Sequence, residues 1–323
     1  MKTTAIIGID EAGYGPNLGP LVISASVWPL SCVQIAEPEV FLKDSLVRCG
    51  IVSDSTRKKN GLIEVGDSKK MYKSGQSPNV LGKNVLPIMS LGDEHRWTWR
   101  QLFLQLDPKS EADLDELPWN RDYDYEIPSV DPNIIQSIRL LLEQEGLGIP
   151  FLKSRVINPG EFNESVEKFA SKGTAHVNWV LELLRESIDA LPQCTTKIHV
   201  YCDKLGARNT YTSFLCMIFD GVLIHAVVES KDMSEYRFEF KNRQINVRFL
   251  VRGESVLPIG FASMTSKYLR ELAMQSFNAF WNARVPDLKP TAGYPLDAKR
   301  FLTEVEASLN QIRLNRSQFW RTR

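Results

Sequence analysis

The 323-residue sequence has few of the side chains that staple a fold by covalent bonds or by zinc. Its five cysteines are an odd number, no two of them form a Cys-x-x-Cys pair, and there are only four histidines. These shortages argue against a disulfide framework, a zinc cluster or a histidine-rich metal site. They fit a reducing compartment. We therefore expect a cytoplasmic protein in which any metal ion is held by carboxylate oxygens.

Long apolar runs are also missing. No stretch of 18 or more apolar residues occurs, so we expect no membrane-spanning helix. Residues 1–10 form a short apolar run that ends at a carboxylate, and they lack the length and the small-residue cleavage site of a signal peptide. With 43% hydrophobic and 24% charged residues, the composition is that of a globular protein able to bury its own core.

The chain has no net charge, because 39 basic residues balance 39 acidic ones, and this balance alone does not indicate a nucleic-acid partner. The two signs are nevertheless separated along the sequence. Residues 107–131 hold nine acids and two bases, whereas residues 237–323 hold fifteen bases and seven acids. Two interpretations are open: solvated faces of both signs, or a basic working surface with an acidic insert elsewhere.

Hydrophobic periodicity predicts one mixed α/β domain. The predicted strands are 3–9, 21–28, 151–157, 197–202, 222–229, 236–241 and 245–251, the first two as an antiparallel pair. The predicted helices are 40–47, 133–144, 160–191 with a break near 172, 210–220, 257–281 and 303–312. Residues from about 75 to 133 suggest an elaborated insert, part strand and part loop.

Carboxylates follow three of the predicted strands. Asp10 and Glu11 follow the first, Asp203 a central one and Glu254 a late one. Ligands in α/β sheets gather where strand ends converge, and crowded carboxylates resist ionisation unless a cation compensates their charge. Oxygen ligands suit Mg²⁺ or Mn²⁺, and four carboxylates can hold two such ions for phosphoryl transfer. The alternative is that these acids are ordinary strand-end and turn residues, since spacing alone does not show that they meet.

Two loops contain groups that bind phosphate. The glycine-rich turn at 13–19 can present backbone N–H groups to phosphate or sugar oxygens, although a tight hairpin explains the glycines equally well. The loop at 67–70, Asp-Ser-Lys-Lys, combines a hydroxyl with two ammonium groups. It is either a phosphate-binding loop or a plain solvated one.

Five motifs in the same order resemble those of type 2 ribonucleases H, the RNase HII and RNase HIII branches. They are 10–22, which opens Asp-Glu-Ala-Gly-Tyr-Gly, the Asp-Ser-Lys-Lys loop, Asp203, Gly253-Glu254-Ser255 with its following helix, and Gly293-Tyr294-Pro295. The resemblance implies a single catalytic domain over 1–323, with an RNase H-like mixed central sheet flanked by helices. It also implies an insert at about 75–133 and a C-terminal helical extension from about 257.

The resemblance further implies an endonuclease of DNA replication and repair that cuts the RNA strand of RNA–DNA hybrids, leaving 3′-hydroxyl and 5′-phosphate ends. Asp10, Glu11, Asp203 and Glu254 would hold two Mg²⁺ or Mn²⁺ ions. The implied substrate-binding residues are Gly13, Tyr14, Gly15, Lys69, Lys70, Ser263, Lys267 and Tyr294. Among them, the glycines would face the ribose 2′-hydroxyl, the lysines phosphates, and Tyr294 a sugar near the cut. We expect a monomer with a nucleic-acid partner and no obligate protein partner.

Two positions depart from the RNase HII pattern. Tyr14 stands where RNase HII has Arg, and Tyr cannot supply the charged fork of Arg, so the preference between a single embedded ribonucleotide and a long hybrid stays open. Glu254 stands where RNase HII has Asp, and the RNase HIII branch often has Glu there. Two other functions remain possible on the same fold: a non-catalytic nucleic-acid-binding module, or a nuclease of different substrate preference.

The remaining polar candidates have plain structural interpretations. We interpret His199 and His225 as buried, satisfied side chains in apolar strands, and His176 as a surface or packing residue of its helix. Asp232 and Glu229 are weak alternatives for a carboxylate ligand. The arginine-rich C-terminal end (Arg313, Arg316, Arg321 and Arg323) either contacts nucleic acid or is solvated, and we favour the solvated interpretation.

Overall fold

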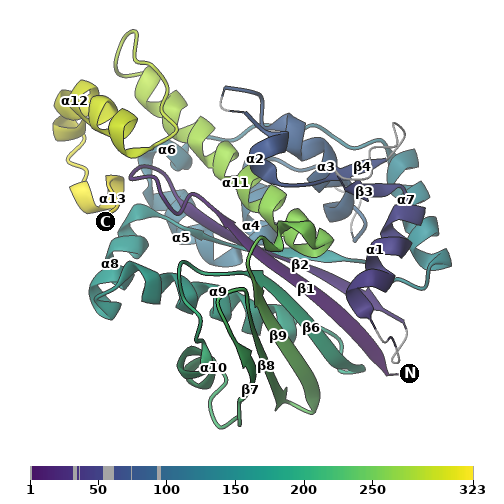
Figure 1. Ribbon diagram of the computed structural model, residues 1–323. Helices are drawn as coiled ribbons and strands as arrows, with labels where there is room; N and C mark the ends of the chain where they lie inside the picture. Colours follow the sequence, from purple (N-terminus) through teal and green to yellow (C-terminus); the bar gives the residue numbers. More distant parts are fainter. Residues whose placement is uncertain are drawn as a thin grey trace.

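A seven-stranded mixed sheet forms the centre of the fold. The computed structural model describes residues 2–31, 35, 37–53, 62–73, 75–92 and 96–322, without the side chains of Ser53 and Glu254. Across the sheet the strand order is β5-β2-β1-β6-β9-β8-β7 (Figure 1). The strands are β1 (Thr3–Ala12), β2 (Leu21–Leu30), β5 (Phe151–Ile157), β6 (Thr195–Asp203), β7 (His225–Glu229), β8 (Met233–Phe240) and β9 (Arg243–Leu250).

The pairing of the strands fixes which ends lie together. β1, β6 and β9 are neighbours and parallel, and the remaining pairs of the sheet are antiparallel. The predicted antiparallel pair of β1 and β2 is confirmed, with Asp10 opposite Ser24. The expected mixed central sheet flanked by helices is likewise confirmed. The carboxyl ends of β1, β6 and β9 consequently meet at one edge of the sheet.

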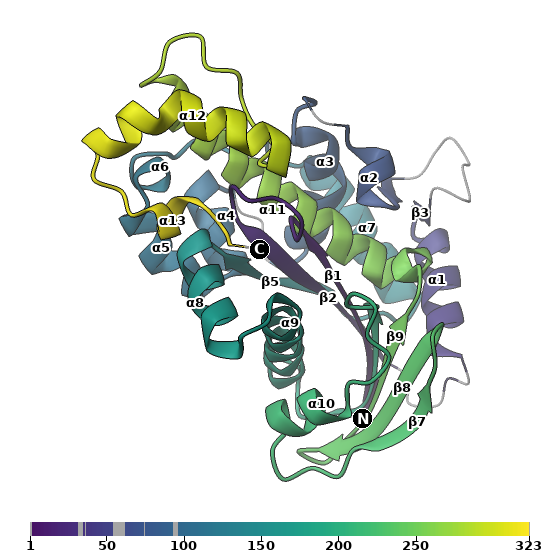
Figure 2. The same cartoon turned by 60° about the vertical axis from the view of Figure 1, so that its left-hand side comes forward.

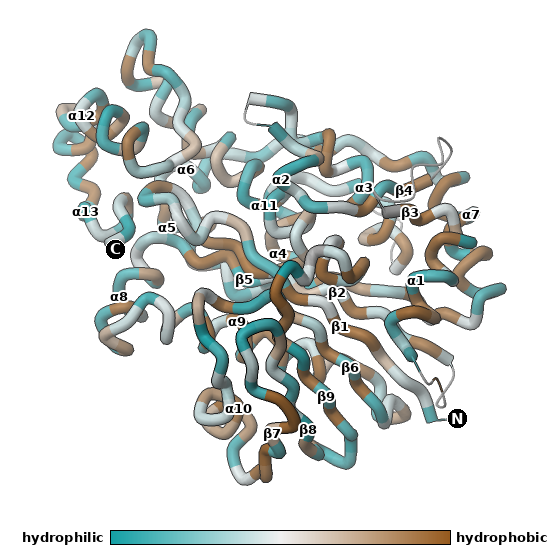
Figure 3. Tube along the Cα trace, in the orientation of Figure 1, coloured by the Kyte–Doolittle hydropathy of each residue, from teal (hydrophilic) through white to brown (hydrophobic). Residues whose placement is uncertain are grey.

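Side chains alternate between the two faces of each strand, as the alternating hydropathy along β6 and β9 indicates (Figure 3). One face carries apolar residues such as Ile7, Val200 and Val247 and packs on α9 (Lys172–Asp189) and α10 (Thr212–Ile218). The other face carries more polar residues, and its β1–β2 half is covered by α11 (Leu257–Asn282). Figure 1 shows α11 crossing these strands, with α9 and α10 behind the sheet.

Gly8 allows α11 to lie directly on β1. A Cβ atom at Gly8 would lie 2.2 Å from the carbonyl carbon of Pro258, in the first turn of α11, so a larger side chain would push the helix away. The Ser26 hydroxyl on β2 donates a hydrogen bond of 2.6 Å to the Pro258 carbonyl oxygen. These contacts fix the height and angle of α11, which carries side chains of the candidate site.

In its described residues the segment at 75–133 consists of helices and loops, so the strands expected in this insert are wrong, whereas loops such as 122–131 are as expected. It contains α3 (Asn79–Met89), α4 (Trp99–Leu106), η2 (Pro108–Ser110), α5 (Glu111–Glu116) and α6 (Pro118–Arg121), followed by α7 (Pro132–Gln144). Short helices replace one long amphipathic pattern, and Thr98 and Gln101 form a capping box at the start of α4. Trp99 and Phe103 then anchor α4 in the core under α11.

The remaining elements frame the sheet. They are α1 (Pro38–Arg48), the parallel pair β3 (Ile51–Ser53) and β4 (Ile63–Val65), α2 (Ser68–Met71), α8 (Pro159–Phe169), η3 (Gly253–Ser255), α12 (Pro295–Gln311) and α13 (Arg316–Phe319). The helix predicted at 303–312 begins earlier, at Pro295, because proline is well accommodated in the first turn of a helix. Aromatic side chains of α11, α12 and α13 pack together and form the C-terminal extension. None of the helices in the described ranges is long and apolar enough to cross a membrane.

Candidate active site

Three strand ends bring the predicted acids to one edge of the sheet. Asp10 lies near the end of β1 and Asp203 is the last residue of β6, its parallel neighbour. The Gly253 N–H, just beyond β9, donates a hydrogen bond of 3.1 Å to Oδ1 of Asp203. Glu254 is the next residue, in η3, and only its backbone belongs to the described part of the chain. The sheet therefore brings Asp10, Asp203 and the Glu254 backbone to the same edge.

The surroundings of Asp10 disfavour its ionised form. Burial, the adjacent Glu11 carboxylate and the negative charge of Asp203 together raise the pKa of Asp10 to about 8, against a partial lowering by the side chain of Ser263. Two serines of α11 hold this residue, because the Ser266 hydroxyl also donates a hydrogen bond of 3.0 Å to the Asp10 carbonyl oxygen. A crowded carboxylate of this kind ionises readily only when a cation compensates it.

Glu11 points to the opposite face of the sheet, toward α9. Its Oε2 lies 3.6 Å from Nε2 of His176, slightly longer than a hydrogen bond, and the His176 side chain is only 4% exposed. Burial opposes ionisation of Glu11, but the interaction with His176 and the charge of Lys69 outweigh it and lower the pKa of Glu11. The two adjacent acids thus have pKa values shifted in opposite directions.

His176 is a site residue that the sequence interpretation missed. It was expected at the surface or in plain packing, whereas it is buried and faces a candidate catalytic acid. The available signal is helical spacing: His176 precedes Val180 and Leu184, two core residues of α9, by four and eight positions. That spacing places the imidazole on the buried stripe of the helix.

The Asp-Ser-Lys-Lys loop lies beside the acids. The Ser68 hydroxyl is 3.1 Å from the Ser263 hydroxyl, which connects the loop to the serine that faces Asp10. Asp67 caps α2 by accepting the Lys69 N–H at 2.9 Å. The ammonium of Lys69 lies close enough to lower the pKa of Glu11, and both Lys69 and Lys70 are exposed. This loop is therefore placed where a phosphate of a substrate could approach it.

The glycine-rich turn between β1 and β2 completes this edge. Gly13 has a φ of +88°, and a Cβ there would lie 2.3 Å from Nε of the buried Arg270, so glycine is required. Gly15 has open space around it. The ammonium of Lys172 lies 4.3 Å from the centre of the Tyr14 ring, and the centre of the His176 ring lies 4.7 Å from it. Burial and the charge of Glu11 raise the pKa of Tyr14.

The C-terminal end is packed against this turn, so its interpretation as solvated is wrong for Arg321, which is 1% exposed. Its guanidinium donates a hydrogen bond of 2.7 Å to the Gly13 carbonyl oxygen, and its N–H donates one of 2.8 Å to the Asn17 carbonyl oxygen. The Gly293 carbonyl oxygen accepts the Asn17 N–H at 2.8 Å, which places the exposed Tyr294 nearby. Figures 1 and 2 both show the β1–β2 turn beside the C-terminus.

Lys267 is the predicted substrate contact that the structure directs elsewhere. Its ammonium donates a hydrogen bond of 2.5 Å to Oε1 of Glu271 and lies 5.2 Å from the centre of the Tyr72 ring. The Tyr72 hydroxyl donates to the same carboxylate at 3.0 Å. A phosphate contact by Lys267 therefore requires competition with Glu271, and it stays a prediction.

The other acidic candidates are either bonded to other side chains or exposed. Glu229 accepts hydrogen bonds from the hydroxyls of Tyr236 and Thr212, and Asp232 is exposed. His199 and His225 are not buried and satisfied as expected: His199 is half-buried and His225 exposed. The interpretation failed because the apolar residues of each strand point to one face of the sheet, whereas both histidines point to the other face.

The donor set fits hard divalent cations. Within the described side chains, which exclude that of Glu254, no three His, Cys, Asp or Glu residues are arranged as a complete metal site. Asp10, Glu11 and Asp203 nevertheless supply oxygen ligands alone, and their mutual repulsion raises the pKa of Asp10. Oxygen ligands and uncompensated negative charge are the conditions that Mg²⁺ and Mn²⁺ satisfy.

No protein-family model and no curated protein matches the sequence. Solved structures that resemble the chain include type 2 ribonucleases H. Ribonuclease H2 from Pyrococcus horikoshii OT3 is 14% identical, with a TM-score of 0.44, over 98% of this chain and 92% of that chain. RNase HII in the PCNA:RNase HII complex from Archaeoglobus fulgidus is 15% identical, with a TM-score of 0.43, over 98% of this chain and 94% of that chain. Bst-RNase HIII in complex with Mn²⁺ is 14% identical, with a TM-score of 0.41, over 93% of this chain and 62% of that chain. At such TM-scores and identities, these resemblances carry no inference about activity.

Proposed function

We propose that this protein is an endoribonuclease that hydrolyses the RNA strand of RNA–DNA hybrids with the help of two Mg²⁺ or Mn²⁺ ions, leaving 3′-hydroxyl and 5′-phosphate ends. One observation carries the proposal. Asp10, with its raised pKa, lies beside Glu11 and Asp203 at the carboxyl ends of parallel strands, where the Asp-Ser-Lys-Lys loop and the glycine-rich turn also meet. The ordered motifs of the sequence supply the substrate class.

The chain's own side chains would hold the metal ions and set the geometry of the site. Asp10, Glu11, Asp203 and Glu254 would hold them; when bound, such ions activate a water molecule and stabilise the departing 3′-oxygen. Ser263 orients the Asp10 carboxylate, and His176 orients Glu11 from the opposite face of the sheet. These two neighbours leave the acids few alternative rotamers, so the carboxylates are pre-organised for a cation.

Substrate recognition would come from the turn and the loops. Gly15 leaves its backbone open to a ribose 2′-hydroxyl, the group that distinguishes RNA from DNA. Lys69, Lys70 and Lys172 supply positive charge to the phosphates on either side of the acids. Tyr14 offers a ring held by Lys172 in place of an arginine fork, which favours packing on a sugar over bidentate grip of a phosphate.

The test is cleavage of an end-labelled RNA–DNA hybrid by the purified full chain with Mg²⁺ or Mn²⁺. A second substrate is a DNA duplex with one embedded ribonucleotide. We expect metal-dependent cutting of the hybrid by the natural protein and by Glu306→Gln, an exposed carboxylate of α12 that serves as the control. Asp10→Ala should cut neither substrate. EDTA should abolish all cutting.

Each alternative function has its own outcome in this assay. A folded protein that binds the hybrid without cutting it, with affinity unchanged in Asp203→Ala, contradicts the proposal and indicates a binding module. Equal cutting of DNA or of single strands contradicts the substrate class and indicates a nuclease of different preference. Cutting of the long hybrid but not of the embedded ribonucleotide would assign that restriction to Tyr14, which Tyr14→Arg then tests.

A further inference from the structure

A second polar region lies on the same sheet, far from the acids. Along β6, residues 197, 199, 201 and 203 point to one face, so Lys197 and His199 share a face with Asp203. Asp203 lies six positions after Lys197, a distance of about 20 Å along the strand. This part of the face lies beyond the region that α11 covers, over β6, β9, β8 and β7 (Figure 1).

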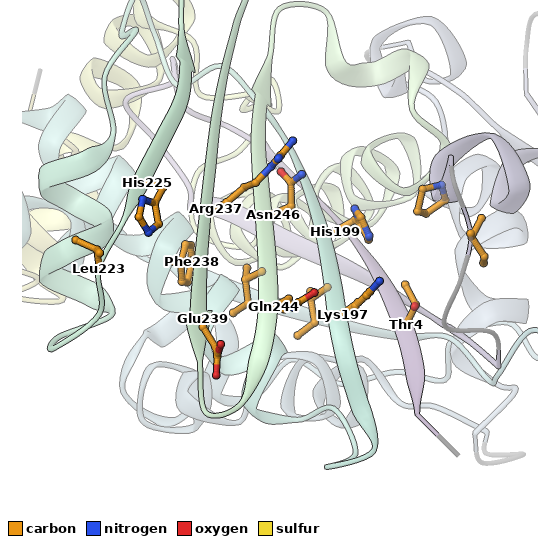
Figure 4. A pocket seen from close by; sticks show the side chains of 14 residues that line it. Thr4, Lys197, His199, Leu223, His225, Arg237, Phe238, Glu239, Gln244 and Asn246 are labelled. Atoms are coloured by element: carbon orange, nitrogen blue, oxygen red, sulfur yellow. The ribbon is translucent and has the colours of Figure 1, made fainter.

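Strand register arranges the side chains of this region in two rows. In the first row His225, Arg237, Asn246 and His199 lie side by side on β7, β8, β9 and β6. At about 4.8 Å per strand, this row is roughly 14 Å long. The second row, two residues further along, includes Gln244, Lys197 and Thr4. Figure 4 shows both rows lining one cavity.

We call it the strand-face cavity, and its volume is about 520 Å³. This size falls in the usual range for a small-molecule site. Apolar atoms of Leu223 and Phe238 contribute to its wall between the polar groups. A mixed lining of this kind suits a ligand with both a charged and an apolar part.

Several polar groups of the cavity have no partner within the described chain, although the Asn246 amide and Arg237 both donate to Glu235. Thr4 is 2% exposed, and its hydroxyl makes no hydrogen bond to any described residue; the same holds for Oδ1 of Asn246. The side chains of Lys197, His199 and His225 likewise form no hydrogen bond or ion pair with the described parts of the chain. A buried hydroxyl without a partner is costly unless water or a ligand satisfies it.

The adjacent row shows what satisfied groups look like on this sheet. There the Tyr201 hydroxyl donates to Glu39 at 2.7 Å, and Arg248 bridges Glu39 and Glu235 at 3.4 and 3.1 Å. Arg237, at the boundary, donates to Glu235 at 2.7 Å and keeps 59% of its side chain exposed. The polar side chains of the adjacent row thus have partners, whereas the Thr4 hydroxyl and Oδ1 of Asn246 in the cavity have none within the described chain.

We propose that the strand-face cavity binds an organic phosphate of nucleotide size. Lys197 and Arg237 supply formal positive charge, and the histidines, the amides and the Thr4 hydroxyl supply further donors for phosphate oxygens. Among the described lining residues Glu239 is the one acid; it is exposed and lies two strands away from Lys197.

A single-stranded nucleic acid fits the cavity less well. Non-specific single-strand sites combine a basic groove with exposed aromatic rings on which bases stack. Phe238 is the aromatic side chain of the described lining, and it is only 5% exposed. The cavity therefore offers donors for phosphate without a stacking platform.

The test is isothermal titration of the metal-free full chain in EDTA with adenosine diphosphate, pyrophosphate and adenosine. We expect the two phosphates to bind one site and adenosine to bind more weakly than adenosine diphosphate. Lys197→Glu should weaken both phosphates by about tenfold or more, and Lys197→Gln by less. Lys299→Glu, the same change on the exposed surface of α12, should leave binding unchanged. Thermal melting confirms that each variant is folded.

Three results would overturn the proposal. They are no phosphate binding at millimolar concentration, binding that Lys197→Glu leaves intact while Asp10→Asn alters it, and binding of an oligothymidylate but of neither phosphate. The last result would indicate a nucleic-acid path. Because the titration needs neither metal nor cleavage, its outcome is independent of whether the protein cuts hybrids.

Discussion

The two ends of the polar face of the sheet differ in charge, in the helices that cover them and in the hydrogen bonds that their side chains make. At the carboxyl end, Asp10 and Asp203 are flanked by α11 and α2, and serines hold the acids. At the amino end, Lys197 and His199 lie in the strand-face cavity, beyond the region that α11 covers, and their side chains have no partner in the described chain. The same strand, β6, carries both ends. One face of one strand, in a chain of zero net charge, thus carries basic side chains at its amino end and an acid at its carboxyl end.

Asp203→Asn should have the largest effect, and it tests the acidic end. The change removes one charged oxygen donor but preserves the shape and can still accept the Gly253 N–H. We expect hybrid cleavage to fall by roughly a thousandfold, because the carboxylates would act together on the metal ions. Single-turnover rates on the hybrid measure it. Asp232→Asn, an exposed acid near the same edge, is the matched control and should retain activity.

His176→Ala should have a smaller effect at the same end. The imidazole supports Glu11 without belonging to the proposed ligand set, and losing such support costs about tenfold or more in activity or metal affinity. The concentration of Mn²⁺ needed for half-maximal cleavage should rise. His225→Ala, in the strand-face cavity, should leave both quantities unchanged. Equal effects of the two histidine changes would remove the distinction between the two ends.

The sequence predicts the strands and the acids of this comparison for a physical reason. A compact apolar run that ends in Asp10, and another that ends in Asp203, predict two buried strands that end in carboxylates. That the two strands are parallel neighbours, so that these ends meet, is shown by the structure. Alternation within Lys197–Cys202 also contains the information that His199 faces away from the core, although the apolar content of the run led to the opposite interpretation.

Other features of the site depend on contacts between distant segments. Arg321 packs under the glycine turn only because α12 and α13 return along α11, and a lone arginine near the end of a sequence carries no sign of this. The helices at 79–121 are short, so no long period marks them. Local pattern thus specifies the sheet, whereas tertiary packing specifies what surrounds the acids.

Arg321→Ala should lower stability more than it alters chemistry. It leaves the Gly13 carbonyl oxygen without its donor and opens a space beside Phe162, at a cost of about 1–3 kcal/mol in the free energy of unfolding. Relief of repulsion with Arg270, which together with burial lowers the pKa of Arg321 to about 9, offsets part of that cost. Urea denaturation measures the change. Arg316→Ala, exposed on α13, should cost much less.

The pH dependence of stability should show the crowding of the acids most subtly. Burial and Glu11 raise the pKa of Asp10 from 3.8 to about 8, so the folded state retains a proton that the unfolded state has lost. The stability this residue contributes is fully present below pH 3.8 and is lost as the pH rises toward 8. In EDTA, Asp10→Asn should therefore lose less stability between these values than the natural protein. An unchanged slope in urea denaturation at several pH values would argue that Asp10 is not crowded.

Calorimetric titration with Mn²⁺ tests the central claim most directly, that the strand ends bring these acids together around a divalent cation. The account predicts Mn²⁺ binding by the natural protein, weakening of about tenfold or more in both Asp10→Asn and Asp203→Asn, and no change in Lys197→Glu at the other end of the face. Mn²⁺ affinity that survives both asparagine substitutions in folded protein would contradict it.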